Sequence, residues 1–160
     1  VGTFSKSLGS IGGFVSTKKH IAEYIRHKAS AFIFTAALPP ASVAGVIEGL
    51  GILASDSKRR KRLHKNTAFI KRAFFEMGIQ VNNNHVPIVP IQIGDEALTL
   101  YMNRLLFDDG IFAGVAVSPV VPPLKAMIRT SYTSAHTKED LGKILTSFEK
   151  NLKKIGVLPQ

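Results

Sequence analysis

A glycine-rich stretch with a single lysine opens the chain and constrains it more than any other segment. Residues 1–13 read VGTFSKSLGSIGG, so Ser5 and Ser7 flank Lys6, and glycines stand at positions 2, 9, 12 and 13. Glycine lets a backbone approach a ligand closely. Hydroxyl groups and free backbone N–H groups suit a phosphate, and an enclosed lysine can lose its proton and become a nucleophile. The stretch is therefore compatible with a phosphate-bearing ligand beside a reactive lysine.

The spacing of these residues leaves two interpretations open. The stretch is neither a Walker A loop nor a G-x-G-x-x-G fingerprint, because the glycines and the lysine do not follow either order. An exposed glycine- and serine-rich turn with a surface lysine explains the composition equally well. Pyridoxal phosphate is the ligand that suits the first interpretation, since its enzymes hold it through a lysine Schiff base.

Further motifs follow in a fixed order along the chain. They are GTFSKSLG at 2–9, GGF at 12–14, FIFTAALPP at 32–40, Ser118-Pro119, Arg129 and AHT at 135–137. Together they resemble the cofactor-lysine half of the α-oxoamine synthases, and the resemblance spans essentially all 160 residues. These are fold-type I pyridoxal phosphate enzymes that join an amino acid to an acyl-CoA with loss of carbon dioxide.

The resemblance implies an α/β fold: the C-terminal portion of a fold-type I PLP-dependent transferase. We expect residues 1–57 to be the end of the large PLP-binding domain, 58–77 a connecting helix, and 78–160 a small α+β C-terminal domain. Family members are more than twice as long, and the residues that hold the cofactor ring precede their lysine. We therefore expect this chain alone to be catalytically incomplete.

Hydrophobic periodicity and turn residues predict the individual elements. Helices are expected at about 18–28, 41–54, 55–77, 95–110 and 137–156, and strands at 13–17, 31–35, 86–93, 111–117 and 126–132. The run 31–35 is predicted to be a buried strand. The helix at 41–54 is predicted to bury an apolar stripe, and its glycines at 45, 49 and 51 to admit another backbone. Two prolines favour a sheet edge or an irregular start for the strand at 86–93.

The resemblance also implies roles for particular residues of the first third of the chain. Lys6 would hold the cofactor covalently and move a proton at the substrate α-carbon. Thr3 matches the family threonine that binds the cofactor phosphate, and Ser5 is a weaker candidate. Thr35 and Ala36 lie in a segment that reaches across the family's dimer to the partner's phosphate. From chemistry alone, a capping or turn role for Thr35 is the simpler interpretation.

Two predicted substrate-binding residues lie in the second half of the chain. Arg129 matches the family arginine that binds the amino-acid carboxylate, which its planar fork suits. Because apolar residues flank Arg129 on the predicted strand, we expect its guanidinium to be buried and to need a partner. A structural salt bridge with Asp108, Asp109 or another carboxylate is therefore the alternative. Ser118 begins a proline-rich loop that resembles the family's acyl entrance, although stiffening of a connection also explains the prolines. For His136 we expect a hydrogen bond at the start of a helix rather than catalysis.

A basic run stands apart from these motifs. Residues 58–65 read KRRKRLHK, and the chain carries a formal net charge of +10. The run is typical of the solvated face of an amphipathic helix. The alternatives are a nuclear localisation signal, a phosphate-binding patch, or a non-catalytic basic domain that binds nucleic acid.

We therefore predict a PLP-dependent C-acyltransferase that makes an amino ketone, resembling serine palmitoyltransferase. The alternatives within the family are 8-amino-7-oxononanoate synthase and 2-amino-3-ketobutyrate CoA ligase. A further alternative is a pseudoenzyme subunit, which keeps the fold but serves a catalytic partner. The expected partners are a second copy of the chain, an amino acid (serine, alanine or glycine) and an acyl-CoA, without nucleic acid. Membrane-surface association is an option if the acyl chain is long. The chain has no cysteine and no metal-ligand spacing, and we expect a cytoplasmic enzyme without a metal.

Overall fold

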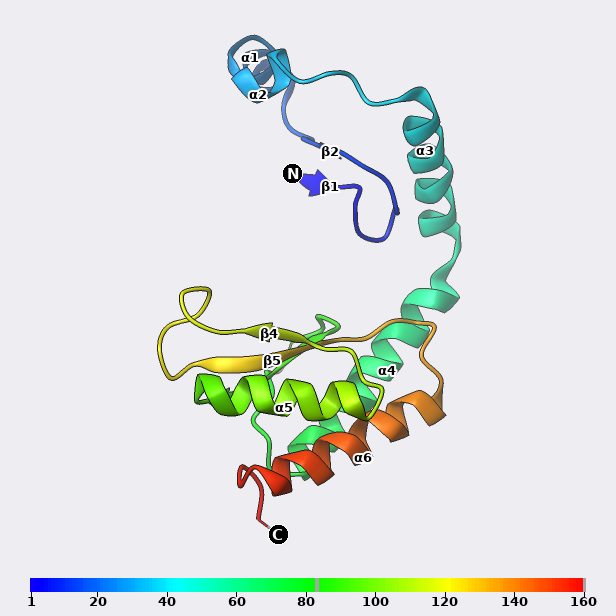
Figure 1. The fold of residues 1–160 in the computed structure, drawn as a ribbon. Helices are drawn as coiled ribbons and strands as arrows, with labels where there is room; N and C mark the ends of the chain where they lie inside the picture. The colour runs from blue at the N-terminus through cyan, green and yellow to red at the C-terminus, as the bar shows by residue number, and fades with distance from the viewer. Residues whose placement is uncertain (83, 160) are drawn as a thin grey trace. The chain divides into compact units, whose positions relative to one another are not determined.

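The computed structural model describes residues 1–82 and 84–159, which form two compact units. The first comprises Val1–Ser57 and the second Lys58–Gln160. Figure 1 shows the course of the chain through both. Each unit is described by itself.

The first unit is a small ladder followed by three helices (Figure 1). Strands β1 (Gly2–Thr3) and β2 (Gly13–Phe14) pair antiparallel and enclose the lysine loop. Helices α1 (Lys19–Lys28), α2 (Ser30–Ile33) and α3 (Pro40–Ser55) follow. Pro40 stands in the first turn of α3, where a missing N–H has no cost.

The buried strand predicted at 31–35 is wrong, because this segment contains the short helix α2 and is exposed. Its hydrogen bonds close locally: the Ile33 N–H donates to the Ala29 carbonyl at 3.0 Å, and the Phe34 N–H to Ser30 at 2.9 Å. A strand needs a neighbour to satisfy the same groups. Periodicity cannot separate a strand from a helix in so short an apolar run.

The stripe predicted on α3 is also mostly exposed. Of its apolar residues only Val46 is buried, whereas Ile47 is 66% exposed. The predicted close backbone contact fails at Gly45 and Gly51, around which the described residues leave open space. Gly49 has a neighbour, but it is the Leu8 side chain rather than a backbone. The periodicity found the apolar face correctly, but not what covers it.

The second unit is a three-stranded antiparallel sheet with helices α4 (Ser57–Glu76), α5 (Glu96–Asp108) and α6 (Lys138–Lys154). The strands are β3 (Ile88–Gly94), β4 (Gly114–Ala116) and β5 (Ala126–Ser131), in the order β3-β5-β4. β3 is thus an edge strand, as its prolines predicted. β4 is shorter than expected, because the Ile111 N–H completes the end of α5 by donating to the Leu106 carbonyl.

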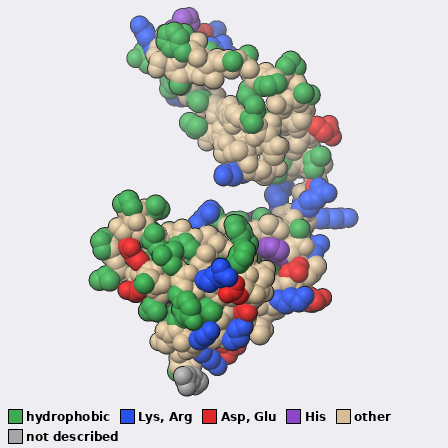
Figure 2. Space-filling view, viewed as in Figure 1, with side chains coloured by type: hydrophobic (Ala, Val, Ile, Leu, Met, Phe, Trp, Pro, Cys, Tyr) green, Lys and Arg blue, Asp and Glu red, His purple; other side chains and the backbone are tan. Residues whose placement is uncertain are grey.

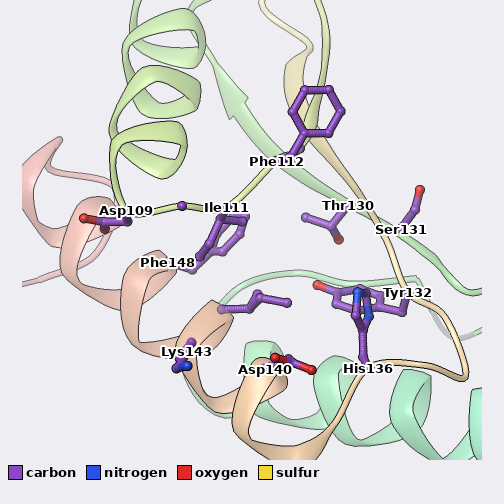
Figure 3. A pocket seen from close by; sticks show the side chains of 13 residues that line it. Asp109, Ile111, Phe112, Thr130, Ser131, Tyr132, His136, Asp140, Lys143 and Phe148 are labelled. Carbon is purple, nitrogen blue, oxygen red and sulfur yellow. The ribbon is translucent and has the colours of Figure 1, made fainter.

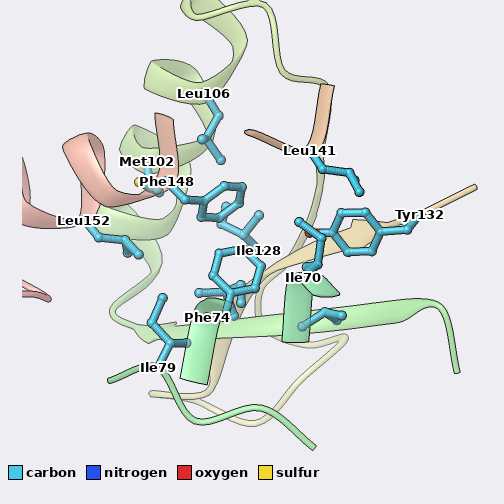
Figure 4. Packing of buried hydrophobic residues seen from close by; sticks show 12 residues of the cluster. Ile70, Phe74, Ile79, Met102, Leu106, Ile128, Tyr132, Leu141, Phe148 and Leu152 are labelled. Atoms are coloured by element: carbon cyan, nitrogen blue, oxygen red, sulfur yellow. The ribbon is translucent and has the colours of Figure 1, made fainter. Parts of the chain in front are cut away.

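One hydrophobic core joins the sheet to the three helices (Figure 4). The central strand β5 alternates, with Ile128 and Thr130 buried and Arg129 exposed. Phe74 of α4 and Phe148 of α6 are fully buried and meet edge to face at 5.2 Å. Burying one such side chain contributes about 1.5–3 kcal/mol. The helices therefore cover one sheet face and leave the other open.

The helix ends of the second unit follow the predicted signals. Asp95 caps α5 by accepting from the Leu98 N–H at 2.8 Å. Thr137 and Asp140 form a reciprocal capping box at the start of α6. Gly78, Gly110 and Gly156 end α4, α5 and α6 with positive φ, which only glycine adopts at little cost. In the second unit the capping residues at the helix ends and the packing of the core therefore favour the same fold.

Candidate active site

The loop that carries Lys6 is closed by its own hydrogen bonds. The Phe4 N–H donates to the Gly12 carbonyl at 2.9 Å, and the Ser10 N–H donates to the Phe4 carbonyl at 3.0 Å. The Phe4 and Phe14 rings stack at 5.6 Å beneath it. These contacts hold a compact loop with Lys6 near its tip. The sequence does not reveal this stacked pair, because nothing in the order of residues marks it.

Two glycines of this loop are required by close neighbours. A Cβ at Gly12 would lie 2.5 Å from Leu38 Cδ2, and the residue has φ +88°. A Cβ at Gly13 would lie 2.6 Å from the Gly2 carbonyl oxygen across the β1–β2 ladder. At Gly12 the positive φ is the stronger constraint, since the end of the Leu38 side chain can shift, whereas at Gly13 a side chain would clash with backbone. The loop therefore rests directly on the segment that follows Thr35.

Hydroxyl groups gather where a phosphate was predicted. Thr3 Oγ1 and Ser5 Oγ lie 2.9 Å apart, and the Ser5 N–H points to Thr3 Oγ1 at 3.3 Å. Both side chains are exposed, so each can reorient toward a ligand oxygen. Two hydroxyls and a backbone N–H on one turn fit the acceptor oxygens of a phosphate. The residues present therefore suit the phosphate of pyridoxal phosphate.

Lys6 itself is exposed rather than enclosed. Its position beside the hydroxyl pair suits a covalent link to the cofactor. The described residues of the first unit do not supply the enclosure that the nucleophile interpretation expected.

Thr35 and Ala36 follow α2 and are both exposed. The Thr35 hydroxyl donates to the Ala31 carbonyl one turn earlier, which is the turn role that chemistry alone favoured. No hydrogen bond joins Thr35 to the Lys6 loop within the described part of the first unit. Leu38, two residues beyond Ala36, nevertheless contacts the loop at Gly12.

Arg129 lies at the middle of β5 on the open sheet face, between Pro90 of β3 and Gly114 of β4. Its side chain is exposed, so the expectation of a buried guanidinium is wrong. The proposed salt-bridge partners are engaged elsewhere: Asp108 pairs with Arg104 at 3.0 Å, and Asp109 with Lys150 at 2.7 Å. No ion pair of Arg129 occurs among residues 1–82 and 84–159. The guanidinium is available for a ligand carboxylate.

Ser118 begins the loop after β4 and precedes a cis peptide bond to Pro119. Its N–H donates to Glu96 Oε1 at 3.1 Å, which ties the loop to the first turn of α5. Glu96 is a positioning residue that the sequence did not reveal, since the two positions lie 22 residues apart. Its signal in the sequence is only that of an acidic residue at a helix start.

His136 has the structural role that was expected. Its Nδ1 accepts from the Thr133 N–H at 3.3 Å, and its carbonyl accepts from Asn66 Nδ2 at 3.0 Å. These bonds fix the chain just before α6. His136 also lines a hollow of about 330 Å³ in the second unit (Figure 3). None of the predicted site residues lines this hollow.

The buried Tyr132 hydroxyl lines this hollow and has no hydrogen-bond partner among residues 1–82 and 84–159 (Figure 3). Burial raises the pKa of Tyr132 to about 12, so the phenol stays protonated at neutral pH.

In the part of the chain that the structure describes, no three His, Asp or Glu side chains are placed to bind a metal ion. None of its helices combines the length and apolar character needed to cross a bilayer.

The class I and II aminotransferase family matches residues 1–148. The chain belongs to this family. An 8-amino-7-oxononanoate synthase of Thermoanaerobacter pseudethanolicus is 39% identical over 99% of the chain, and a serine palmitoyltransferase of Bacteriovorax stolpii is 38% identical over 99%. The matched segments are 40% and 38% of those two proteins. The predicted resemblance to the α-oxoamine synthases is confirmed.

Solved structures agree with this family assignment. The serine palmitoyltransferase of Sphingomonas wittichii matches with a TM-score of 0.91 and 29% identity, over 99% of this chain and 40% of that protein. A structure of SPT with a PLP internal aldimine matches with a TM-score of 0.91 and 30% identity, over 98% and 40%. The fold is that of the C-terminal portion of a fold-type I transferase, as predicted.

Proposed function

We propose that the protein is a pyridoxal phosphate-dependent C-acyltransferase that condenses an amino acid with an acyl-CoA and releases carbon dioxide. The observation that carries this proposal is the loop around Lys6, with its Thr3 and Ser5 hydroxyl pair, in a chain that matches two such synthases along 99% of its length. The chain spans about 40% of the length of these relatives, so the activity is proposed for the whole protein.

Each predicted residue has one role in this proposal. Lys6 is the covalent attachment point of pyridoxal phosphate, and its amine moves a proton at the substrate α-carbon. Thr3 and Ser5 bind the phosphate. When bound, the cofactor stabilises negative charge at that carbon. Arg129 holds the substrate carboxylate through its two parallel N–H groups, which orients the bond that is broken. Ser118, held by Glu96, lies beside the acyl chain.

The assembly we propose is a homodimer with composite active sites, in which Thr35 and Ala36 reach the partner's phosphate. The exposure of both residues supports this, since neither is used in the packing of its own unit. We place the enzyme in the cytoplasm. Residues 1–57 are proposed as part of the large domain, 58–77 as the connecting helix and 78–160 as the small domain.

Two enzymes of the family, which differ in their acyl-CoA substrate, are candidates within this proposal. A serine palmitoyltransferase would use serine and a long unbranched acyl-CoA. An 8-amino-7-oxononanoate synthase would use alanine and an acyl-CoA with a terminal carboxylate, as the carbon skeleton of its product requires. Relatives of both kinds match almost equally well, at 39% and 38% identity. Assays with the two substrate pairs separate them.

The test of the common proposal is the change Lys6→Ala in the whole protein. The wild type should be yellow with bound cofactor, and borohydride reduction should leave the label on the peptide that contains Lys6. The variant should lose both the label and the acyl-CoA-dependent release of carbon dioxide. Lys18→Ala, an exposed lysine of the same unit, is the matched control. A labelled protein whose label lies elsewhere would overturn the assignment of Lys6.

A further inference from the structure

One face of α4 concentrates positive charge. It comprises Lys58, Lys61, Arg62, Lys65 and Arg72 with Phe69 among them, and we call it the basic face. At 3.6 residues per turn these six side chains fall within an arc of about 100°. All six are exposed. Figure 2 shows Lys and Arg side chains gathered over the first turns of this helix.

The opposite side of α4 is fixed, so the basic face is presented by a rigid element. Ile70 and Phe74 are fully buried in the core of the second unit. Asn66 Nδ2 donates to the Thr133 carbonyl at 3.1 Å and to the His136 carbonyl at 3.0 Å. The helix cannot roll without breaking these contacts, and its cations therefore keep pointing outward.

The part of α4 that carries the basic face has no acidic residue of its own. Residues 57–75 contain no Asp or Glu. Arg72 pairs with Glu76 at 2.9 Å, one turn beyond. Lys61 and Lys65 form no ion pair with any residue that the structure describes. A row of like charges at this spacing is unfavourable by itself, and a negatively charged surface would relieve the repulsion.

Phe69 indicates which kind of anionic surface fits. It stands at the centre of the basic face and is 51% exposed, while Phe75 at the border is 72% exposed. A helix with Lys and Arg beside aromatic residues is typical of binding in the interface plane of a membrane, where the rings enter the headgroup boundary. Against a nucleic-acid backbone, Phe69 would instead face phosphates that offer it no apolar contact.

We propose that the basic face of α4 binds anionic phospholipid headgroups, with Phe69 inserted among them. Clusters of four to eight Lys and Arg on a helix are the pattern that attracts acidic lipids. The basic face has five Lys and Arg residues, which is within this range, and they lie together on one side of the helix. The proposal does not depend on the acyl-transfer reaction, because it uses none of the residues assigned to that chemistry.

The test is sedimentation of the cofactor-loaded protein with vesicles, without substrates. Vesicles of phosphatidylcholine containing phosphatidylglycerol should bind the protein, and vesicles of phosphatidylcholine alone should not. Lys61→Gln with Lys65→Gln should weaken binding about 30-fold, since each cation near such a surface contributes roughly a factor of five. Lys125→Gln with Lys154→Gln removes the same charge from other elements of the second unit and should change binding by less than about threefold, since exposed charges away from the contact surface are screened by salt.

A second pair of variants tests the aromatic contribution. Phe69→Ser should weaken vesicle binding about fivefold, because about half of the ring's apolar surface would leave water on insertion. Phe107→Ser is the control, since Phe107 lies on α5 and is 58% exposed. Circular dichroism of each variant would show that its fold is retained.

Two outcomes would overturn the proposal. Equal losses for the two lysine pairs would mean that only the net charge of the protein matters. Absence of vesicle binding, together with binding of a duplex DNA that weakens steeply with salt, would assign the basic face to nucleic acid instead. The yellow colour of the same samples reports the cofactor separately, so failure here is distinguishable from failure of the proposed activity.

Discussion

The two units of this protein differ in how much of their apolar surface they bury. The first unit holds Lys6, its hydroxyl pair and Thr35, yet Val46 is the only hydrophobic residue buried among those described there. The second unit buries a continuous core around Phe74 and Phe148. Phe34 in the first unit is 86% exposed, whereas Phe148 in the second is fully buried. The residues proposed to bind the cofactor thus lie in the unit that packs least.

This difference follows from how each unit satisfies its apolar surface. The second unit closes its sheet with three helices that bring their apolar sides to one face. The first unit has only a two-residue ladder and helices whose apolar sides remain exposed. Hydrophobic burial is the main source of folding free energy, so the second unit should carry most of the stability. The first unit is then free to keep loops open for a ligand.

The sharpest test of this contrast compares two phenylalanines. Phe148→Ala should lower the free energy of unfolding by about 3–5 kcal/mol, because it leaves a cavity in the core. Phe34→Ala should change it by less than about 0.5 kcal/mol, since the exposed ring has few contacts to lose. Urea unfolding of the two variants measures both values. A loss of several kcal/mol for Phe34→Ala would break the contrast and show that the ring is covered in solution.

A second test asks whether the openness of the first unit serves the cofactor. Thr35→Ala should weaken pyridoxal phosphate binding roughly tenfold, since it removes a neutral hydroxyl donor to a charged phosphate. The stability of the second unit should not change. Cofactor affinity is measured by equilibrium dialysis of the assembled protein, with Thr17→Ala as the control from the same unit. Unchanged affinity would leave Thr35 with only its turn hydrogen bond to Ala31.

The second unit should respond to the loss of local signals as well as of core residues. Thr137→Ala removes the hydroxyl that accepts from the Asp140 N–H at 3.1 Å and so opens the capping box of α6. The expected loss is about 1 kcal/mol, typical of an N-cap threonine. Thermal unfolding would detect it, and Thr146→Ala on the exposed side of α6 is the control. Equal behaviour of the two variants would mean that the cap contributes nothing here.

The elements of the two units also show how much of the fold the sequence alone could predict. The helix α6 was found almost to its bounds, because apolar periodicity, Thr137 and Gly156 all agree. The edge position of β3 followed from its prolines. The strand predicted at 31–35 failed because a short apolar run is compatible with both states. The stripe on α3 failed for a different reason: periodicity identifies an apolar face but not whether another element covers it.

The candidate site divides in the same way. The Lys6 loop could be recognised in the sequence because its residues are contiguous. The structure adds why glycine is needed at particular positions of the loop. Contacts between distant positions were not recognisable. The Glu96 carboxylate that holds Ser118, and the exposure of Arg129 on the open sheet face, depend on how strands and helices come together. Residue types and their order therefore indicate candidate residues, whereas the packing of strands and helices determines what surrounds each of them.

The last comparison concerns a carboxylate of the second unit whose effect appears only in acid. Asp109 accepts from Lys150 Nζ at 2.7 Å, Ser147 Oγ at 2.7 Å and Asn151 Nδ2 at 2.8 Å. These bonds, the one from Lys150 first, hold the pKa of Asp109 at about 2, below the usual value of 3.8. The folded state thus binds this proton less tightly than the unfolded state. The stabilisation is complete above pH about 4 and is lost as the pH falls toward 2.

Asp109→Asn should therefore flatten the fall in stability between pH 4 and pH 2 that the wild type shows. Urea unfolding of both proteins across this range measures the slope, and Ser147→Ala, which removes one donor, should give an intermediate one. Part of the slope should remain in the variant, because Thr137 also lowers the pKa of Asp140. Identical slopes for Asp109→Asn and the wild type would mean that the Lys150, Ser147 and Asn151 contacts do not persist in acid.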